Sequence, residues 1–79
     1  MDTNIKQIYV QLLDEGTTVW RLTKGIKINN SVYKILPTDN YDPKDENWEF
    51  KPGDFVQCEK RVKEGRIILL AIKLDSVMS

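Results

Sequence analysis

The side chains that most often carry enzyme chemistry are scarce in this sequence. Its 79 residues include no histidine and a single cysteine, Cys58. A Ser-His or Cys-His nucleophile pair therefore cannot form within one subunit. A zinc site needs several thiolate or imidazole ligands, and a disulfide framework needs more than one cysteine. These counts favour a protein that is not an enzyme and that holds no metal and no cofactor.

The most unusual group of polar side chains is an acidic and aromatic segment at 39–49, where five carboxylates accompany one lysine. An aromatic ring surrounded by carboxylates suits recognition of a basic protein surface, because aromatics supply contact area and charges steer the encounter. Its carboxylates lack the spacing of an EF-hand loop, and none is spaced as an acid/base pair. The candidate partner-binding residues are Tyr41, Asp42, Asp45, Glu46 and Trp48.

A structural interpretation of the same segment stays open. Trp48 and Phe50 are two residues apart, so on a strand they share a face and can cover the end of a small core. Tyr41 would then be the exposed aromatic of a solvated loop. The function we expect is a non-enzymatic binding module of the inhibitor, immunity or adaptor type, whose partner is another protein.

The basic residues offer an alternative function, a nucleic-acid-binding small β-barrel that uses the hairpin at 60–66. A basic patch beside aromatic rings can bind RNA or single-stranded DNA through phosphate contacts and base stacking. Against this, the formal net charge is zero and Glu59 and Glu64 lie among the basic residues. A continuous basic groove beside exposed aromatics would favour nucleic acid. The residues concerned are Lys60, Arg61, Lys63 and Arg66, with Lys24 and Lys27 and with Tyr9, Trp20 or Tyr33 nearby.

Hydrophobic residues recur mostly with a period of two, which is typical of β-strands. The turn signals are Gly16, the pair Asn29-Asn30, Pro52-Gly53 and Glu64-Gly65. A proline after Asp42 allows one helical turn but not a full helix. The strands we expect lie near 8–13, 17–28 with a bend at Gly25, 32–36, 48–50, 55–62 and 66–74.

Short strands joined by tight turns predict an all-β protein, a small antiparallel SH3-like barrel of five to six strands with at most a single helical turn. We expect one domain over residues 1–79, with residues 1–5 and 75–79 frayed. The side chains that we expect to be buried are Ile8, Val10, Leu12, Val56, Cys58, Ile68 and Leu70, and Val62 shares the strand parity of Val56 and Cys58.

Two stretches resemble a family of short, uncharacterised bacterial proteins. The first runs from Ile8 through Tyr-Val-Gln-Leu-Leu-Asp-Glu-Gly-Thr to Arg21. The second contains Tyr41-Asp42-Pro43 and Trp48-Glu49-Phe50-Lys51-Pro52-Gly53-Asp54. The resemblance covers most of the chain but implies no established activity.

A local stretch is also similar to the first half of SH3 domains. It comprises Tyr41-Asp42, Asp45-Glu46, Phe50-Lys51, Gly53-Asp54 and Val56. In SH3 domains this pattern spans an acidic loop, a turn and the following strand. This chain has no tandem tryptophan and no Pro-x-x-Tyr segment after it, so the similarity implies local barrel geometry and not polyproline binding.

The remaining expectations concern location and association. Met1–Lys6 is polar, and the longest apolar run, Ile67–Ile72, is too short to cross a bilayer, so we expect a cytoplasmic protein without a membrane contact. That run presents apolar side chains to both faces of its strand. One parity, Ile67 with Leu69 and Ala71, must be covered by a loop, a terminus or a second copy, so monomer and homodimer both stay open.

Overall fold

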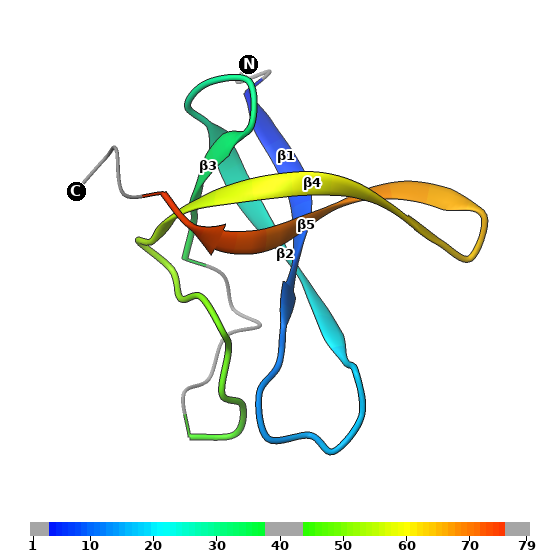
Figure 1. Cartoon of the computed structure of the whole chain (residues 1–79). Coiled ribbons are helices and arrows are strands. Elements are labelled where there is room, and N and C mark those ends of the chain that lie inside the picture. Colours follow the sequence, from blue (N-terminus) through cyan, green and yellow to red (C-terminus); the bar gives the residue numbers. More distant parts are fainter. Residues whose placement is uncertain (1–3, 38–43, 76–79) are drawn as a thin grey trace.

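The computed structural model describes residues 4–37 and 44–75, which contain five β-strands and no helix (Figure 1). The strands follow one another along the chain and each pairs with the next in the antiparallel direction. They are β1 (Ile5–Gln11), β2 (Trp20–Lys27), β3 (Val32–Ile35), β4 (Phe55–Lys63) and β5 (Arg66–Leu74).

The sheet closes on itself between the first and the last strand. Because the strand direction alternates along an odd number of strands, β1 and β5 run the same way and their pairing is parallel. It consists of one residue pair, Tyr9 with Leu70. The result is a closed five-stranded barrel, which confirms the expected all-β class and is consistent with a small SH3-like barrel. Its one departure from the predicted antiparallel arrangement is this closing pair.

The alternation of apolar side chains predicts the buried residues of β1 and of β4 correctly. Ile8 and Val10 are fully buried, and Leu12, just after β1, is 3% exposed. Val56 and Cys58 of β4 face the same interior. The remaining core side chains come from β3, from β5 and from the segment after the third strand: Tyr33, Ile35, Trp48, Phe50 and Ala71.

The connection between β1 and β2 is longer than the predicted hairpin turn. Thr17 and Thr18, expected in the second strand, lie in a loop, and pairing resumes at Trp20, which lies opposite Gln11. Asp14 has a φ of 64° and Gly16 a φ of 74°. The Leu12 N–H donates to the Val19 carbonyl and the Leu13 N–H to the Asn47 carbonyl, so the chain after β1 is held to the segment 44–50 and does not close a tight turn at Gly16.

The hairpin of β4 and β5 has the predicted turn, and its outer part lies outside the barrel. Glu64 and Gly65 both have positive φ, as a two-residue hairpin turn requires, and Lys63 pairs with Arg66. The two strands extend beyond the point where β5 crosses β1 (Figure 1). Val62 has the strand parity of Val56 and Cys58, but it is 73% exposed because this part of the hairpin lies outside the barrel.

A register shift in the same hairpin changes which residues of β5 are buried. Gln57 pairs with Lys73 and Cys58 with Ala71, so Ile72 is the extra residue of a bulge. Ala71 and Leu69, which were expected to need separate cover, pack on the core cluster, and Leu70 is buried as well. Ile68, predicted in the core, is only half-buried. A bulge changes the strand's face over one residue, so strict alternation cannot describe both ends of the strand.

The segment 44–54 covers one end of the barrel without forming the strand expected at 48–50. Trp48 makes one isolated bridge to Leu12, and the backbone around it is held to the end of β1 by two hydrogen bonds. Phe50 is buried beside it, which confirms the structural interpretation of these two rings. Lys44 and Asp45 form a turn, and the rest of the possible helical turn lies outside the described residues. The predicted turn at Pro52-Gly53 is present, with a φ of 97° at Gly53.

Two residues within the stretches expected to be frayed make backbone contacts, whereas residues 1–3 and 76–79 lie outside the described residues. Ile5 already pairs with Ile26. Asp75 is 6% exposed, and its backbone N–H donates to the Phe55 carbonyl at 2.9 Å. Among the described residues there is no helix with the length and hydrophobicity needed to cross a membrane.

Candidate functional site

Of the five residues predicted to bind a partner, the structure describes three. Tyr41 and Asp42 lie outside the described residues. Asp45 is exposed. Trp48 is 1% exposed, so its placement on a partner-binding surface is wrong: the ring is part of the barrel core.

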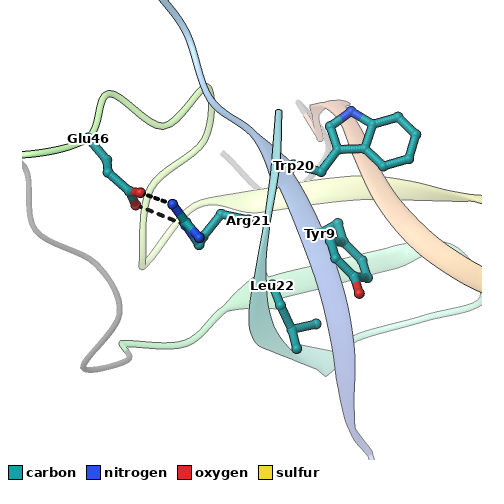
Figure 2. Close-up of a pocket in the computed structure, with 5 residues that line it drawn as sticks. All are labelled: Tyr9, Trp20, Arg21, Leu22 and Glu46. Atoms are coloured by element: carbon teal, nitrogen blue, oxygen red, sulfur yellow. Dashed lines mark hydrogen bonds and ion pairs between the residues drawn. The ribbon is translucent and has the colours of Figure 1, made fainter. Parts of the chain in front are cut away.

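Glu46 is held by contacts within the chain. Its Oε1 accepts hydrogen bonds from Arg21 Nε at 3.2 Å and from Trp48 Nε1 at 2.9 Å, and its Oε2 pairs with Arg21 Nη2. The bond from Arg21, followed by that from Trp48, lowers the pKa of this carboxyl, and Glu46 in turn raises the pKa of Arg21. Figure 2 shows Arg21 turned away from Trp20 and toward Glu46. These bonds hold the segment 44–50 to β2, so most of the acceptor capacity of the Glu46 carboxylate is used within the chain.

The half-exposed aromatic rings of the described residues lie elsewhere. They are Tyr9, Trp20 and Phe55, whereas Tyr33 is 5% exposed. Tyr9 and Leu22 are directly opposite on β1 and β2, and Figure 2 shows Trp20 on the same side as both. These side chains and the Arg21–Glu46 pair line a shallow pocket of about 350 Å³.

A groove begins on the other side of Tyr9. Since β1 and β5 pair only at Tyr9 and Leu70, the residues before that pair on each strand leave a space between them. This space has a volume of about 250 Å³. We call it the Tyr9 groove, and it is lined by Lys6, Gln7, Tyr9, Arg66, Ile67, Ile68 and Leu69.

The charges around the Tyr9 groove are predominantly positive. Lys63 reaches over from β4 and places its Nζ 5.9 Å from the centroid of the Tyr9 ring. It also lies 3.8 Å from the exposed Glu64. Lys6 and Arg66, at the two rims, make no ion pair with any residue that the structure describes. The groove therefore combines an accessible ring with three cations.

The basic residues predicted around the hairpin differ in whether an acidic side chain pairs with them. Arg61 is paired with Glu59 on the same strand, so its charge is largely compensated. Lys60 has no ion-pair partner within 4–37 and 44–75. Lys6 and Gln7 were not among the sequence candidates. The Tyr9–Leu70 pairing brings them near the hairpin, and no local pattern signals that pairing.

The distribution of charge explains how a neutral chain can carry a basic groove. The segment 39–49 holds five of the 12 acidic side chains and one of the 12 basic ones. The rest of the chain therefore has eleven basic side chains against seven acidic ones. The net charge of zero is therefore the sum of an acidic segment at 39–49 and an excess of basic side chains in the rest of the chain.

Chemistry at Cys58 is disfavoured by its surroundings. The thiol is 7% exposed inside the core, and burial raises its pKa to about 12. The nucleophilic thiolate is then almost absent near neutral pH. No cluster of metal-ligating side chains occurs among the described residues.

Comparison with known proteins found no matching family model, no matching curated protein and no matching solved structure. The resemblance to short bacterial proteins therefore stays a prediction, and the functional proposal depends on the geometry alone.

Proposed function

We propose that this chain is a non-enzymatic module that binds single-stranded nucleic acid in the Tyr9 groove. One observation supports this above the other functions considered. The accessible ring of Tyr9 lies among Lys6, Lys63 and Arg66, while the rings of the acidic segment that the structure describes, Trp48 and Phe50, are buried.

The chemistry of the groove suits an unpaired strand. A base can stack on the Tyr9 ring, since every nucleobase has a π-face, and such stacking contributes about 1–3 kcal/mol per base. The ammonium of Lys63, now over that ring, can turn to a phosphate, and Lys6 and Arg66 provide contacts at both rims. The recognition would be tolerant of sequence, because the groove offers a ring and charges more than a pattern of hydrogen-bond donors and acceptors.

Binding of a basic protein by the acidic segment remains the second proposal. The charge segregation between 39–49 and the rest of the chain supports it, and Asp45 is an exposed carboxylate of that segment. The Arg21–Glu46 pair and the buried Trp48 remove two of the five residues on which it depended.

Fluorescence anisotropy with a labelled dodecamer of deoxythymidine tests the first proposal. We expect the wild-type chain to bind at low salt and Tyr9→Leu to weaken binding about tenfold, the equivalent of one lost stacking contact. Phe55→Leu is the matched control, because Phe55 is also half-exposed and has Lys34 Nζ 5.6 Å from its ring, but lies outside the groove. It should change the affinity less than twofold.

Two outcomes would contradict the proposal. Absence of oligonucleotide binding by the wild-type chain overturns it directly, and equal losses in Tyr9→Leu and Phe55→Leu would show that the groove is not the site. Capture of a basic protein that Asp45→Lys abolishes and Tyr9→Leu leaves unchanged would favour the second proposal.

A further inference from the structure

The part of the β4–β5 hairpin outside the barrel carries two apolar side chains that are largely exposed to solvent. Val62 and Ile67 are directly opposite each other, and each is 73% exposed. Side chains two residues apart share a strand face, so Val62 continues the face that holds Cys58 in the core. Beyond the barrel this face meets solvent, and we call Val62 and Ile67 the hairpin pair.

Cations lie on both faces of the hairpin around this pair. Lys60 shares the face of Val62, whereas Lys63 and Arg66, the next residue pair toward the turn, point to the other face, where Lys63 lies over the Tyr9 ring. Apolar side chains within a positively charged setting fit a ligand that has both negative charge and apolar faces. Unstacked nucleotides have this chemistry, since phosphates alternate with exposed base faces.

The hairpin pair is also continuous with the Tyr9 groove. Ile67 and Arg66 line the groove, and Ile67 is at the same time half of the hairpin pair. Because β1 and β5 pair only at Tyr9 and Leu70, the edge of β5 at Arg66 and Ile67 borders the groove, and a strand that passes over this edge reaches the hairpin pair. The four residues from Arg66 to Leu69 span about 10 Å of strand, which allows further nucleotides to lie along the hairpin.

We propose that the hairpin pair is a second contact for the same nucleic-acid strand, in which Val62 and Ile67 pack against bases and Lys60 binds a phosphate. This inference rests on the proposed function. It adds that the ligand is an unpaired strand long enough to reach from Tyr9 to the hairpin.

An anionic membrane is the other surface that an apolar and basic hairpin could meet. The hairpin pair is aliphatic, and none of the residues 60–67 is the tryptophan or tyrosine that is enriched at lipid interfaces. Together with its continuity with the groove, this favours the nucleic-acid strand.

The test compares two lengths of oligonucleotide. We expect the double variant Val62→Thr/Ile67→Thr to bind deoxythymidine dodecamer about tenfold more weakly than wild type. The single variant Val62→Thr leaves every groove residue in place, so it should weaken dodecamer binding but bind the deoxythymidine dinucleotide with unchanged affinity. Threonine keeps the β-branched shape that strands prefer. Leu74→Thr is the control, since Leu74 is 58% exposed at the far end of β5, and it should leave both affinities unchanged.

A second readout reports base contact directly. In a dodecamer with one 2-aminopurine, wild type should change the fluorescence at a position outside the groove, and the double variant should abolish that change. Circular dichroism melting within a few degrees of wild type is expected of this exposed pair, and it establishes that the variant is folded.

The outcomes distinguish this inference from the proposed function. Equal dodecamer affinities for the double variant and wild type, with Tyr9→Leu still weakened, overturn the hairpin contact alone. Absence of wild-type binding to either oligonucleotide overturns both. Binding to vesicles of phosphatidylserine and phosphatidylcholine that the double variant loses, with dodecamer affinity unchanged, would assign the hairpin to a membrane instead.

Discussion

At the scale of single residues, the same residue type has different roles according to its contacts. Glu46 and Asp45 are neighbours in one acidic segment, but Glu46 is enclosed by Arg21 and Trp48 while Asp45 is exposed. Trp20 and Trp48 likewise differ, since one borders a pocket and the other fills the core. A carboxylate or a ring becomes a candidate for function only when its neighbours leave it accessible.

The ion pair of Glu46 predicts a stability that depends on pH. Its folded pKa is lowered, so the stabilisation is present above the ordinary carboxyl pKa of 4.5 and is lost as pH falls through the folded value. Glu46→Gln should cost about 0.5–1 kcal/mol at pH 7, a modest amount because water screens the Arg21 side chain, which is 43% exposed.

Urea unfolding at pH 7 and at pH 3 measures this effect. Asp45→Asn is the control, since Asp45 is exposed, and it should change the free energy of unfolding little at either pH. A gap between wild type and Glu46→Gln that stays the same at pH 3 would show that the ion pair is not its source.

The buried thiol predicts slow chemical modification. With the pKa of Cys58 raised to about 12, the thiolate fraction at pH 8 is roughly a thousandfold below that of a thiol with the ordinary pKa. Native protein should therefore react with Ellman's reagent far more slowly than protein in 6 M guanidinium chloride, a medium that exposes the thiol. Similar rates in the two conditions would contradict the burial.

At the scale of elements, one residue pair decides the shape of the candidate site. β1 and β2 share seven pairs, whereas β1 and β5 share one. The barrel is closed at Tyr9 and Leu70, and the strands are free to separate before it. A longer ladder there would fill the groove with paired backbone and would leave Lys6 and Arg66 on an ordinary sheet surface.

This closure makes Leu70 a sensitive position. It is 6% exposed, and Leu70→Ala should cost about 2–4 kcal/mol through lost burial and the resulting cavity. Ile67→Ala is the matched control on the same strand, because Ile67 is 73% exposed, and it should cost little. Thermal unfolding monitored by circular dichroism compares them, and a Leu70→Ala midpoint equal to that of wild type would contradict the core assignment.

At the scale of the whole molecule, opposite charges occupy different parts of the chain. The acidic side chains of 39–49 balance an excess of basic ones elsewhere, so the net charge of zero describes neither part. Local field, more than net charge, steers a charged ligand to its site. A neutral protein can therefore attract an anionic strand to one face.

The proposed interface predicts a definite dependence on salt. Four phosphate contacts, from Lys6, Lys60, Lys63 and Arg66, give a slope of about −3 for log affinity against log salt concentration on a single strand. Lys6→Gln should make this slope less steep by about 0.7. Lys73→Gln, at the far end of β5, should leave the slope unchanged. A slope near zero for wild type would show that phosphates are not bound.

Much of the fold follows from local pattern. Alternation at Ile8, Val10 and Leu12 predicts a half-buried strand, and Glu64-Gly65 predicts a hairpin turn, because both depend on residues close in the chain. The final strand at 66–74 has the bounds that the pattern predicts. The boundary at Thr17 was wrong, since the Leu13 backbone bonds to Asn47, a residue far away in the sequence, and a local pattern does not reveal such a contact.

The sequence by itself determined that this is a small all-β chain without histidine, with one cysteine and with its charge divided between segments. Only the tertiary structure decided which side chains are accessible. Trp48 is buried because its backbone pairs with Leu12, 36 residues earlier at the end of β1. Val62 is exposed because β4 extends beyond the closed part of the barrel. Lys6 and Arg66 flank Tyr9 because β5 returns to β1 at one point. The side-chain period of two fixes the face of a strand, but where distant strands cross depends on how the whole sheet twists and closes.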